Sequence, residues 1–293
     1  MHTLKFSGHD TFHCRQQWLL KGVELINNQE LNGFHNLEES ILNLGVGKNM
    51  VQAIQYWMKA FGLINNEKHL TEIADILFVQ NGGFDKYLED EGTLWLLQYL
   101  LCKQQEASIF KLIFTDYARE RISSEFDERQ ILNFLKLKIA ETSNRETSES
   151  TLQSDFKVFT QSYFSGIRTA KSLEDDFNSP LIELNLISAV NRGNGLTTYK
   201  LNKEDRVTFP SEIFGYCLVD LFGNDAAVNF KDIRDTLGSY FVLTNEGLEV
   251  VIDRLRSKYP EFIYNEDAGT RQLQLKIENE DFKLRLLQNY YGV

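Results

Sequence analysis

The chain has 293 residues and a formal net charge of −11, with 42 acidic against 31 basic side chains. Its length exceeds the usual size of one hydrophobic core, so two or three packed modules are expected. The acidic balance excludes a protein that coats nucleic acid without specificity, and any contact with DNA must come from a local face. No apolar run approaches twenty residues, the N-terminus does not read as a signal peptide, and the three cysteines are isolated. We therefore expect a cytoplasmic protein with no membrane partner.

The first cluster of ligand-capable side chains is the sequence GHDTFHCR at 8–15. In a helix, His9 and His13 would share one face, and so would Asp10 and Cys14. Imidazoles at that spacing can chelate a transition metal, so these four residues are a candidate metal site. A closed zinc site needs a second cysteine close by, and the sequence has none there. We therefore predict no cofactor and keep the metal site as the alternative.

The interpretation that we favour for the same segment is structural. Ser7 or Asp10 caps a helix that starts near Thr11, with Phe12 and Trp18 buried beneath it. Such a cap needs only one of these residues, so the crowding of ligand-capable side chains in this segment is what motivates the metal-site alternative.

The next part of the chain has the element order of a winged helix-turn-helix. An opening helix over 15–26 precedes a helix over 37–44, a Gly-Val-Gly turn and a second helix with apolar residues at spacings of one, three and four. Gly62 ends that helix. Residues 63–70 read as the two short strands of a wing joined by an Asn-Asn turn, and a threonine-capped helix over 71–78 follows.

The polar face of the second helix is the candidate DNA-binding surface. No acidic side chain occurs over 40–66, although the chain as a whole is strongly acidic. In helix-turn-helix proteins the second helix reads bases in the major groove, while other residues hold the phosphates. The residues expected at the bases are Lys48, Asn49, Gln52 and Gln55. Those expected on the phosphates are Lys59, Asn66 and Lys68. Because many winged helices bind only protein, a protein-binding surface is the alternative.

Three consecutive acids at 89–91 precede a strongly apolar helix over 92–101, which is too short to span a membrane. Carboxylates in a row can bind a divalent cation. Acids at this place more often complement the N-terminus of a helix and its dipole, which is the role we expect. No Ser-His-Asp order, nucleophilic Cys-His pair, nucleotide-binding glycine motif or H-E-x-x-H occurs, so the motifs do not support catalysis.

Further along the chain, apolar segments over 109–117 and 128–140 predict helices. A helix from Ser150 to Tyr163 has a start that resembles the recognition helices of bacterial repressors, so a second helix-turn-helix or a plain capped core helix is possible there. A turn at 191–195 is expected before a strand over 197–201.

Two helices over 230–237 and 245–257 and two strands over 262–264 and 271–275, joined by a turn over 265–269, are predicted to form a closing winged-helix-like unit.

We therefore predict a mainly α fold with short β-wings, of the α+β class. Tandem winged helix-turn-helix modules lie around a central helical region. The expected domains are an N-terminal winged helix-turn-helix over 1–83, a central helical region over 84–171 and a C-terminal winged-helix-like region over 172–293.

Five segments resemble a bacterial family catalogued as a domain of unknown function: FSGHDTFHCRQQWLLKG, LGVGKNMVQAIQYW, FGLI followed by LTEIADILF, YLEDEGTLWLLQY and DAGTRQL. They run in order from residue 6 to residue 273. The resemblance implies a gene in a phage-defence or DNA-modification locus of the phosphorothioation type. Sulfate-reductase-like proteins and cysteine desulfurases are the expected neighbours. The resemblance implies a non-catalytic accessory and transfers no catalytic residues.

From the acid-free helix-turn-helix and this resemblance we expect a DNA-binding accessory component of a bacterial phage-defence or DNA-modification system. Its expected partners are double-stranded DNA and proteins from the same defence locus, with the sulfate-reductase-like protein as one candidate. The alternative is a winged-helix adaptor that assembles the proteins of such a system without binding DNA. The acidic total charge and the 21 Phe and 12 Tyr residues favour this alternative, because aromatic residues are enriched in interface cores.

Overall fold

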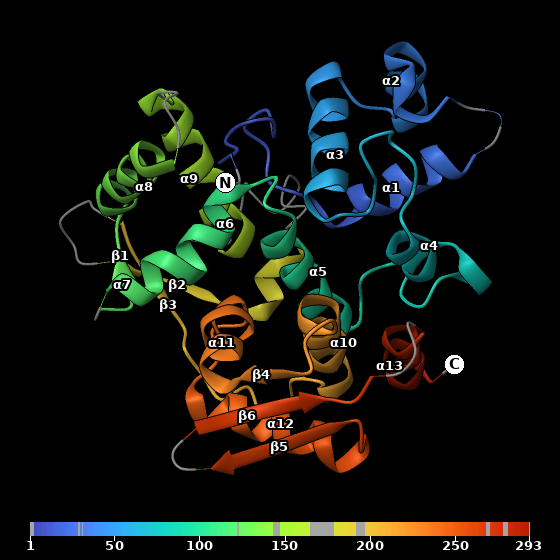
Figure 1. The fold of residues 1–293 in the computed structure, drawn as a ribbon. Coiled ribbons are helices and arrows are strands. Elements are labelled where there is room, and N and C mark those ends of the chain that lie inside the picture. Colours follow the sequence, from blue (N-terminus) through green and yellow to red (C-terminus); the bar gives the residue numbers. More distant parts are fainter. Residues whose placement is uncertain are drawn as a thin grey trace.

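The computed structural model describes residues 3–28, 30, 32–121, 123–142, 147–164, 179–191, 197–267, 270–277 and 281–292. Helices predominate among them, and the strands form two small antiparallel sheets, which confirms the α+β class. Figure 1 shows the helices α1 to α4 at one end, the sheet β4–β6–β5 at the other, and α5 between them. None of the helices in these ranges is long and apolar enough to cross a bilayer.

The N-terminal unit contains the predicted helix pair. Its helices are α1 (Gln16–Asn27), α2 (Leu37–Leu44) and α3 (Lys48–Ala60), with a short 3-10 turn, η1 (Gly33–His35), before α2. Gly62, with φ +64, ends α3 as predicted, because its N–H donates to the carbonyl of Lys59 and the next N–H reaches back to Met58. Trp57 on α3 is fully buried and fixes the inner face of the helix.

In place of the two predicted wing strands there is a single antiparallel bridge between Ile64 and Leu70, in a loop closed by a tight turn, which we call the wing. The helix that follows, α4 (Glu72–Phe78), begins after Thr71 as expected. The predicted threonine cap is wrong, because the Thr71 hydroxyl donates to the carbonyl of Gly62 at 2.7 Å instead of accepting from the helix. The wing is therefore tied to the end of α3.

A short 3-10 turn, η2 (Gln80–Gly82), leads into the central elements. They are α5 (Glu91–Gln104), α6 (Ser108–Leu112), the π-helix η3 (Ile113–Tyr117), α7 (Ala118–Glu120), β1 (Glu125–Phe126), α8 (Glu128–Thr142) and α9 (Glu149–Tyr163). The acids before α5 act as the predicted cap, since Asp90 accepts from the N–H groups of Gly92 and Thr93. The hydroxyl of Tyr290 also donates to Asp90 at 2.7 Å.

The remaining elements carry most of the strand residues. They are η4 (Pro180–Leu184), β2 (Ile187–Asn191), β3 (Thr197–Leu201), α10 (Ser211–Phe222), β4 (Ala227–Asn229), α11 (Phe230–Ile233), the π-helix η5 (Arg234–Gly238), α12 (Asn245–Lys258), β5 (Phe262–Asp267), β6 (Thr270–Leu275) and α13 (Phe282–Tyr291). The strands β1, β2 and β4 and the helices α10 and α13 have no counterpart in the sequence prediction. α10 is mostly apolar, and it packs against α5, α12 and α13.

The two sheets share one connectivity. Their strand orders are β1–β3–β2 and β4–β6–β5, so in each the first strand pairs with the last. The helical segments α8, α9 and η4 separate β1 from the antiparallel pair β2–β3, and α11, η5 and α12 separate β4 from the pair β5–β6. Because β1 pairs with β3, the strand over 197–201 that we placed in the C-terminal region packs with the central elements.

Two predicted turns need comment. The turn at 265–269 is wrong over Asn265 to Asp267, since these residues continue β5 and pair with β6. Residues 268–269 lie outside the described residues. Of the turn at 191–195, Asn191 belongs to β2, and 192–195 lie outside the described residues as well.

One buried amide joins the central helices to the elements from α10 to α13, which we call the C-terminal unit. Gln98 of α5 is fully buried and donates from Nε2 to the carbonyl of Tyr240 at 2.9 Å. Its Oε1 accepts a 2.6 Å hydrogen bond from the hydroxyl of Tyr163 at the end of α9. Removal of the amide would leave two buried polar groups without a partner.

The substitution Gln98→Leu is expected to lower the free energy of unfolding by about 2 to 5 kcal/mol, because the Tyr163 hydroxyl and the Tyr240 carbonyl lose their partners. Urea denaturation measures the change. The control is Gln153→Leu, at an exposed position of α9. Equal unfolding free energies for both variants would show that the buried amide does not join these units.

A carboxylate on α10 ties the last helix to the centre. The carboxyl of Asp220 accepts from the Tyr99 hydroxyl at 2.7 Å, from Lys283 at 3.0 Å and from Lys103. Burial acts to raise the pKa of Asp220, but the hydrogen bond and charge of Lys103, helped by Tyr99 and Lys283, outweigh it and hold this pKa below its usual value.

Because the folded-state pKa of Asp220 is depressed, its stabilising contribution is present above the unfolded pKa of about 3.9 and is lost as pH falls through the folded value. Asp220→Asn should therefore be less stable than the parent at neutral pH, and this difference should shrink as the pH is lowered below about 4. Thermal melting across that pH range tests the prediction. A constant difference at all pH values would contradict it.

Candidate nucleic-acid interface

Residues 3–15 form an extended segment between α3 and α9, which we call the N-terminal strap. Its backbone takes positive φ values at Ser7 (71°), Gly8 (101°), Asp10 (46°) and Thr11 (67°). These values are incompatible with a right-handed helix. The predicted helix start near Thr11 and its cap are therefore wrong, and α1 begins at Gln16 without a side-chain cap.

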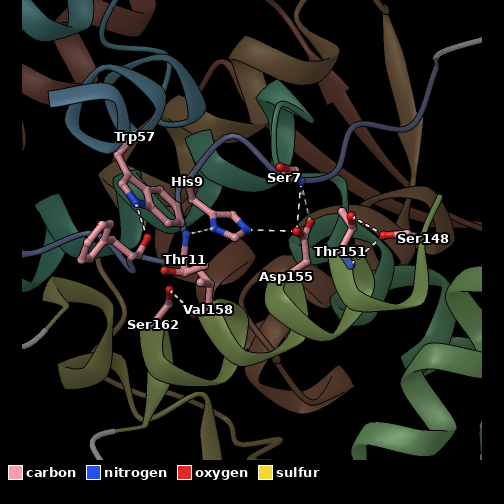
Figure 2. A network of polar contacts seen from close by, with 10 residues as sticks. Ser7, His9, Thr11, Trp57, Ser148, Thr151, Asp155, Val158 and Ser162 are labelled. Atoms are coloured by element: carbon pink, nitrogen blue, oxygen red, sulfur yellow. Dashed lines mark hydrogen bonds and ion pairs between the residues drawn. The ribbon is translucent and has the colours of Figure 1, made fainter. Parts of the chain in front are cut away.

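A buried carboxylate on α9 holds the strap. Asp155 is 1% exposed, and its Oδ1 lies 3.0 Å from both the N–H nitrogen of Ser7 and Nε2 of His9 (Figure 2). His9 is itself buried, and its Nδ1 accepts from the N–H of Thr11 at 3.1 Å. Since Nδ1 accepts, we assign the proton of the neutral ring to Nε2, which donates to Asp155.

The four candidate metal ligands, His9, Asp10, His13 and Cys14, do not converge on one site. Both ring nitrogens of His9 are used in hydrogen bonds. Cys14 is buried, and burial raises the pKa of its thiol well above the usual value, which disfavours the thiolate that binds metals. Asp10 lines a groove described below, and His13 does not join it there. Among the residues that the structure describes, no three His, Cys, Asp or Glu side chains are placed to hold a metal ion.

The strap is also fixed to α3 and α6. Lys5 and Ser108, at the start of α6, exchange two hydrogen bonds of 2.8 and 3.1 Å through their main chains and the serine hydroxyl. The indole of Trp57 donates to the carbonyl of Phe12 at 3.0 Å (Figure 2). A Cβ at Gly8 would stand 2.7 Å from the ring of Tyr56, so only glycine fits between the strap and α3.

Between α3, the strap and the α8–α9 hairpin lies a groove of about 790 Å³. Its lining residues are Thr3, Leu4, Lys5, Phe6, Ser7, Gly8, Asp10, Gln52, Gln55, Tyr56, Lys59, Glu106, Ile139 and Thr147. The Tyr56 hydroxyl is buried and makes no hydrogen bond within the described part of the chain. Burial, and then the charges of Asp155 and Glu106, raise the pKa of this phenol. It therefore stays protonated and can donate to a group in the groove.

The predicted base-reading residues divide along α3. Lys48, Asn49 and Gln52 in its first turns are exposed, and Gln55 is half-buried in the groove. Gln52 and Gln55 are the two that the structure brings into the groove lining.

Two of the three predicted phosphate-binding residues interact with other parts of the protein. Lys59 lines the groove and pairs with Glu106 at 3.5 Å, and Glu106 also contacts Lys5. Lys68 donates to the carbonyl of Phe34 at 3.0 Å, whereas Asn66 is exposed in the wing turn.

Sequence reasoning missed the strap side of the groove. Tyr56 looks like one more apolar residue in the helical pattern, and Lys5, Glu106 and Asp155 lie in separate predicted regions. The one available signal was the glycine of the FSGHD motif, which marks a close backbone approach.

Gly8→Ala should loosen the strap, because alanine is strained at φ +101 and its Cβ would overlap the Tyr56 ring. We expect a loss of about 1 to 3 kcal/mol and faster hydrogen exchange at residues 3–12. Gly47→Ala is the control, since its φ is −70 and no atom lies within 4 Å of the added Cβ. Unchanged exchange in Gly8→Ala would contradict this account of the strap.

Comparison with known proteins concerns the whole chain. A family model described as a protein of unknown function (DUF4007) matches residues 6–291. No curated protein matches the chain. A crystal structure of SspB is 22% identical, with a TM-score of 0.83, and covers 98% of this chain and 88% of that chain. A magnesium ion-bound crystal structure of SspB has the same identity and coverage and a TM-score of 0.84. The likeness to both shows a shared fold, and the family match shows that this chain belongs to the DUF4007 family of proteins of unknown function.

Proposed function

We propose that the chain is a DNA-binding accessory component of a bacterial phage-defence or DNA-modification system. One observation carries the proposal. The first two turns of α3 expose Lys48, Asn49 and Gln52 in a stretch, 40–66, that has no acidic side chain in a chain of net charge −11. In helix-turn-helix complexes it is the N-terminal part of the recognition helix that contacts the bases.

The N-terminus of α3 is suited to phosphate as well. Gly47 stands at its N-cap and supplies no side-chain hydrogen bond, so the N–H groups of Lys48 and Asn49 have no side-chain cap, whereas that of Met50 donates to the Gly47 carbonyl. Free N–H groups and the helix dipole together favour an anion at this end. Lys48 adds a full positive charge beside them.

The proposal includes a tandem winged-helix architecture. In both sheets a short strand is followed by three helical segments and then by an antiparallel strand pair whose second strand lies in the middle of the sheet. This connectivity supports winged-helix units built on α8–α9 and on α11–α12, in addition to the unit built on α1–α3. The small wing at Ile64 and Leu70 fits the same pattern.

DNA binding by this face should be of modest strength. Lys59 is paired with Glu106, and Lys68 donates to a backbone carbonyl. Lys48 is therefore the cation of α3 that can contact a phosphate without breaking an interaction within the protein. Few released counterions give a shallow dependence of affinity on salt. Protein partners from the same locus would then supply the remaining affinity, with a sulfate-reductase-like protein as the candidate that the sequence resemblance suggests.

Lys48→Glu should weaken binding to duplex DNA about fivefold or more, which corresponds to about 1 kcal/mol for an exposed ion pair. Lys48→Ala should lower the slope of log affinity against log salt by about 1. Fluorescence anisotropy at low salt measures both. The matched control is Lys231→Glu, an exposed lysine of α11 in no ion pair among the described residues. If both charge reversals act alike, or if no duplex binds at micromolar protein, α3 is not a DNA-binding surface.

A protein-binding adaptor is the second candidate. The internal commitment of Lys59 and Lys68 favours it, because a surface built for phosphate would keep its lysines available. A stoichiometric protein partner in nuclease-treated lysate, lost in Gln52→Arg but kept in Lys231→Glu, would support this function over DNA binding.

A further inference from the structure

A second cavity, of about 390 Å³, lies between the central helices and the C-terminal unit, far along the chain from the α3 face. Figure 1 labels α7, which contributes residues to this cavity, and α11, the helix directly before η5. Its walls come from η3 and α7 on one side, from the ends of β1 and β3, and from η5 and the start of α12 on the other. Three separate parts of the sequence therefore build it.

The charge of this cavity is opposite to that of the chain. Its lining contains four cations and one carboxylate, Arg119, Arg121, Lys203, Arg234 and Asp235. Arg234 pairs with Asp235 at 2.8 Å, and Arg119 pairs with Asp116 at 2.9 Å. Arg121 lies over the ring of Tyr117 and has no carboxylate partner, and Lys203 is exposed and unpaired within the residues that the structure describes. Two positive charges are thus left uncompensated.

Both π-helices of the described chain border the cavity. η3 contributes Phe114 and Tyr117, and η5 contributes Arg234, Asp235 and Gly238. Single-turn π-helices are rare and recur at functional sites. Next to η5, Val242 has φ +51, which is a strained conformation for a β-branched residue. The strained residue and the two π-helices thus all border this cavity, and the proposed DNA-binding function does not involve any of them.

The lining also has an apolar part. Phe114, Leu201, Val242 and Leu243 are buried and form one side, while the serines at 123, 124 and 239 provide hydroxyl groups. A volume of about 390 Å³ is within the range of small-ligand sites. It is suited to an organic group of the size of a nucleoside. Arginines bind phosphate oxygens with two parallel N–H donors, and Lys203 can add a point charge.

We propose that this cavity is a binding site for a phosphorylated small molecule of nucleotide size, with its phosphates on Arg121, Lys203 and the flanking arginines and its organic part against the apolar side. The negative charge of such phosphates complements Arg121 and Lys203, the two cations of the lining that have no acidic partner among the described residues. The site joins η3 to η5, so an occupant would cross-link the central helices and the C-terminal unit.

Isothermal titration calorimetry with ATP, GTP, CTP and UTP on the full chain without DNA tests this. At least one nucleotide should bind in the micromolar range, and Arg121→Ala with Lys203→Ala should weaken it at least about tenfold. Lys157→Ala with Lys276→Ala removes the same charge from exposed positions outside the cavity and should leave the affinity unchanged. Melting curves without ligand establish that both double variants are folded.

Three results would overturn the proposal. One is the absence of heat with all four nucleotides at about 1 mM, a concentration at which a micromolar site is saturated. Another is an equal loss of affinity in the two double variants, which would indicate general charge attraction. The third is tripolyphosphate binding as tightly as the nucleotides, since the apolar side would then contribute nothing. DNA binding through α3 can succeed or fail independently of each.

Discussion

The buried carboxylate of Asp155 is the constraint on which the N-terminal half of the structure depends. A carboxylate that is 1% exposed must have its charge satisfied by hydrogen bonds, because an unpaired buried charge costs several kcal/mol. The donors come from Ser7 and His9, nearly 150 residues away in the chain. To deliver them, the strap turns through a run of left-handed backbone conformations. The left-handed conformations of the strap thus accompany the delivery of two hydrogen-bond donors to one carboxylate on α9.

That arrangement also shapes the candidate interface. With the strap held on Asp155, Gly8 lies against Tyr56 and the groove opens beside the polar face of α3. In the same packing Lys59 lies beside Glu106, so the C-terminal part of α3 faces the strap while its first turns face solvent. The contacts that hold the strap in place therefore also determine which side chains of α3 remain accessible to a partner.

Buried polar groups join the other units in the same manner. Gln98 joins α5 and α9 to Tyr240 of the C-terminal unit, and Asp220 brings lysines from α5 and α13 onto α10. Each of these groups would be costly to leave unsatisfied, so each specifies one relative placement of its neighbours. Among the described residues, Lys48 at the start of α3 and Arg121 and Lys203 in the cavity between η3 and η5 are cations that no acidic side chain pairs.

The sequence by itself determined the local elements whose signals are short in range. The bounds of α2, the glycine that ends α3, the Asp90 cap and the apolar helix behind it follow from periodicity and capping chemistry, and they were predicted. The strap, the pairing of β1 with β3 and the cavity lined by both π-helices were not, because each depends on groups brought together across tens to hundreds of residues. The four-residue spacing of His9 and His13 suggested a helical metal site. Only the tertiary structure showed that His9 has a different partner, Asp155, since a buried charge takes the donors that folding delivers to it rather than those next to it in the chain.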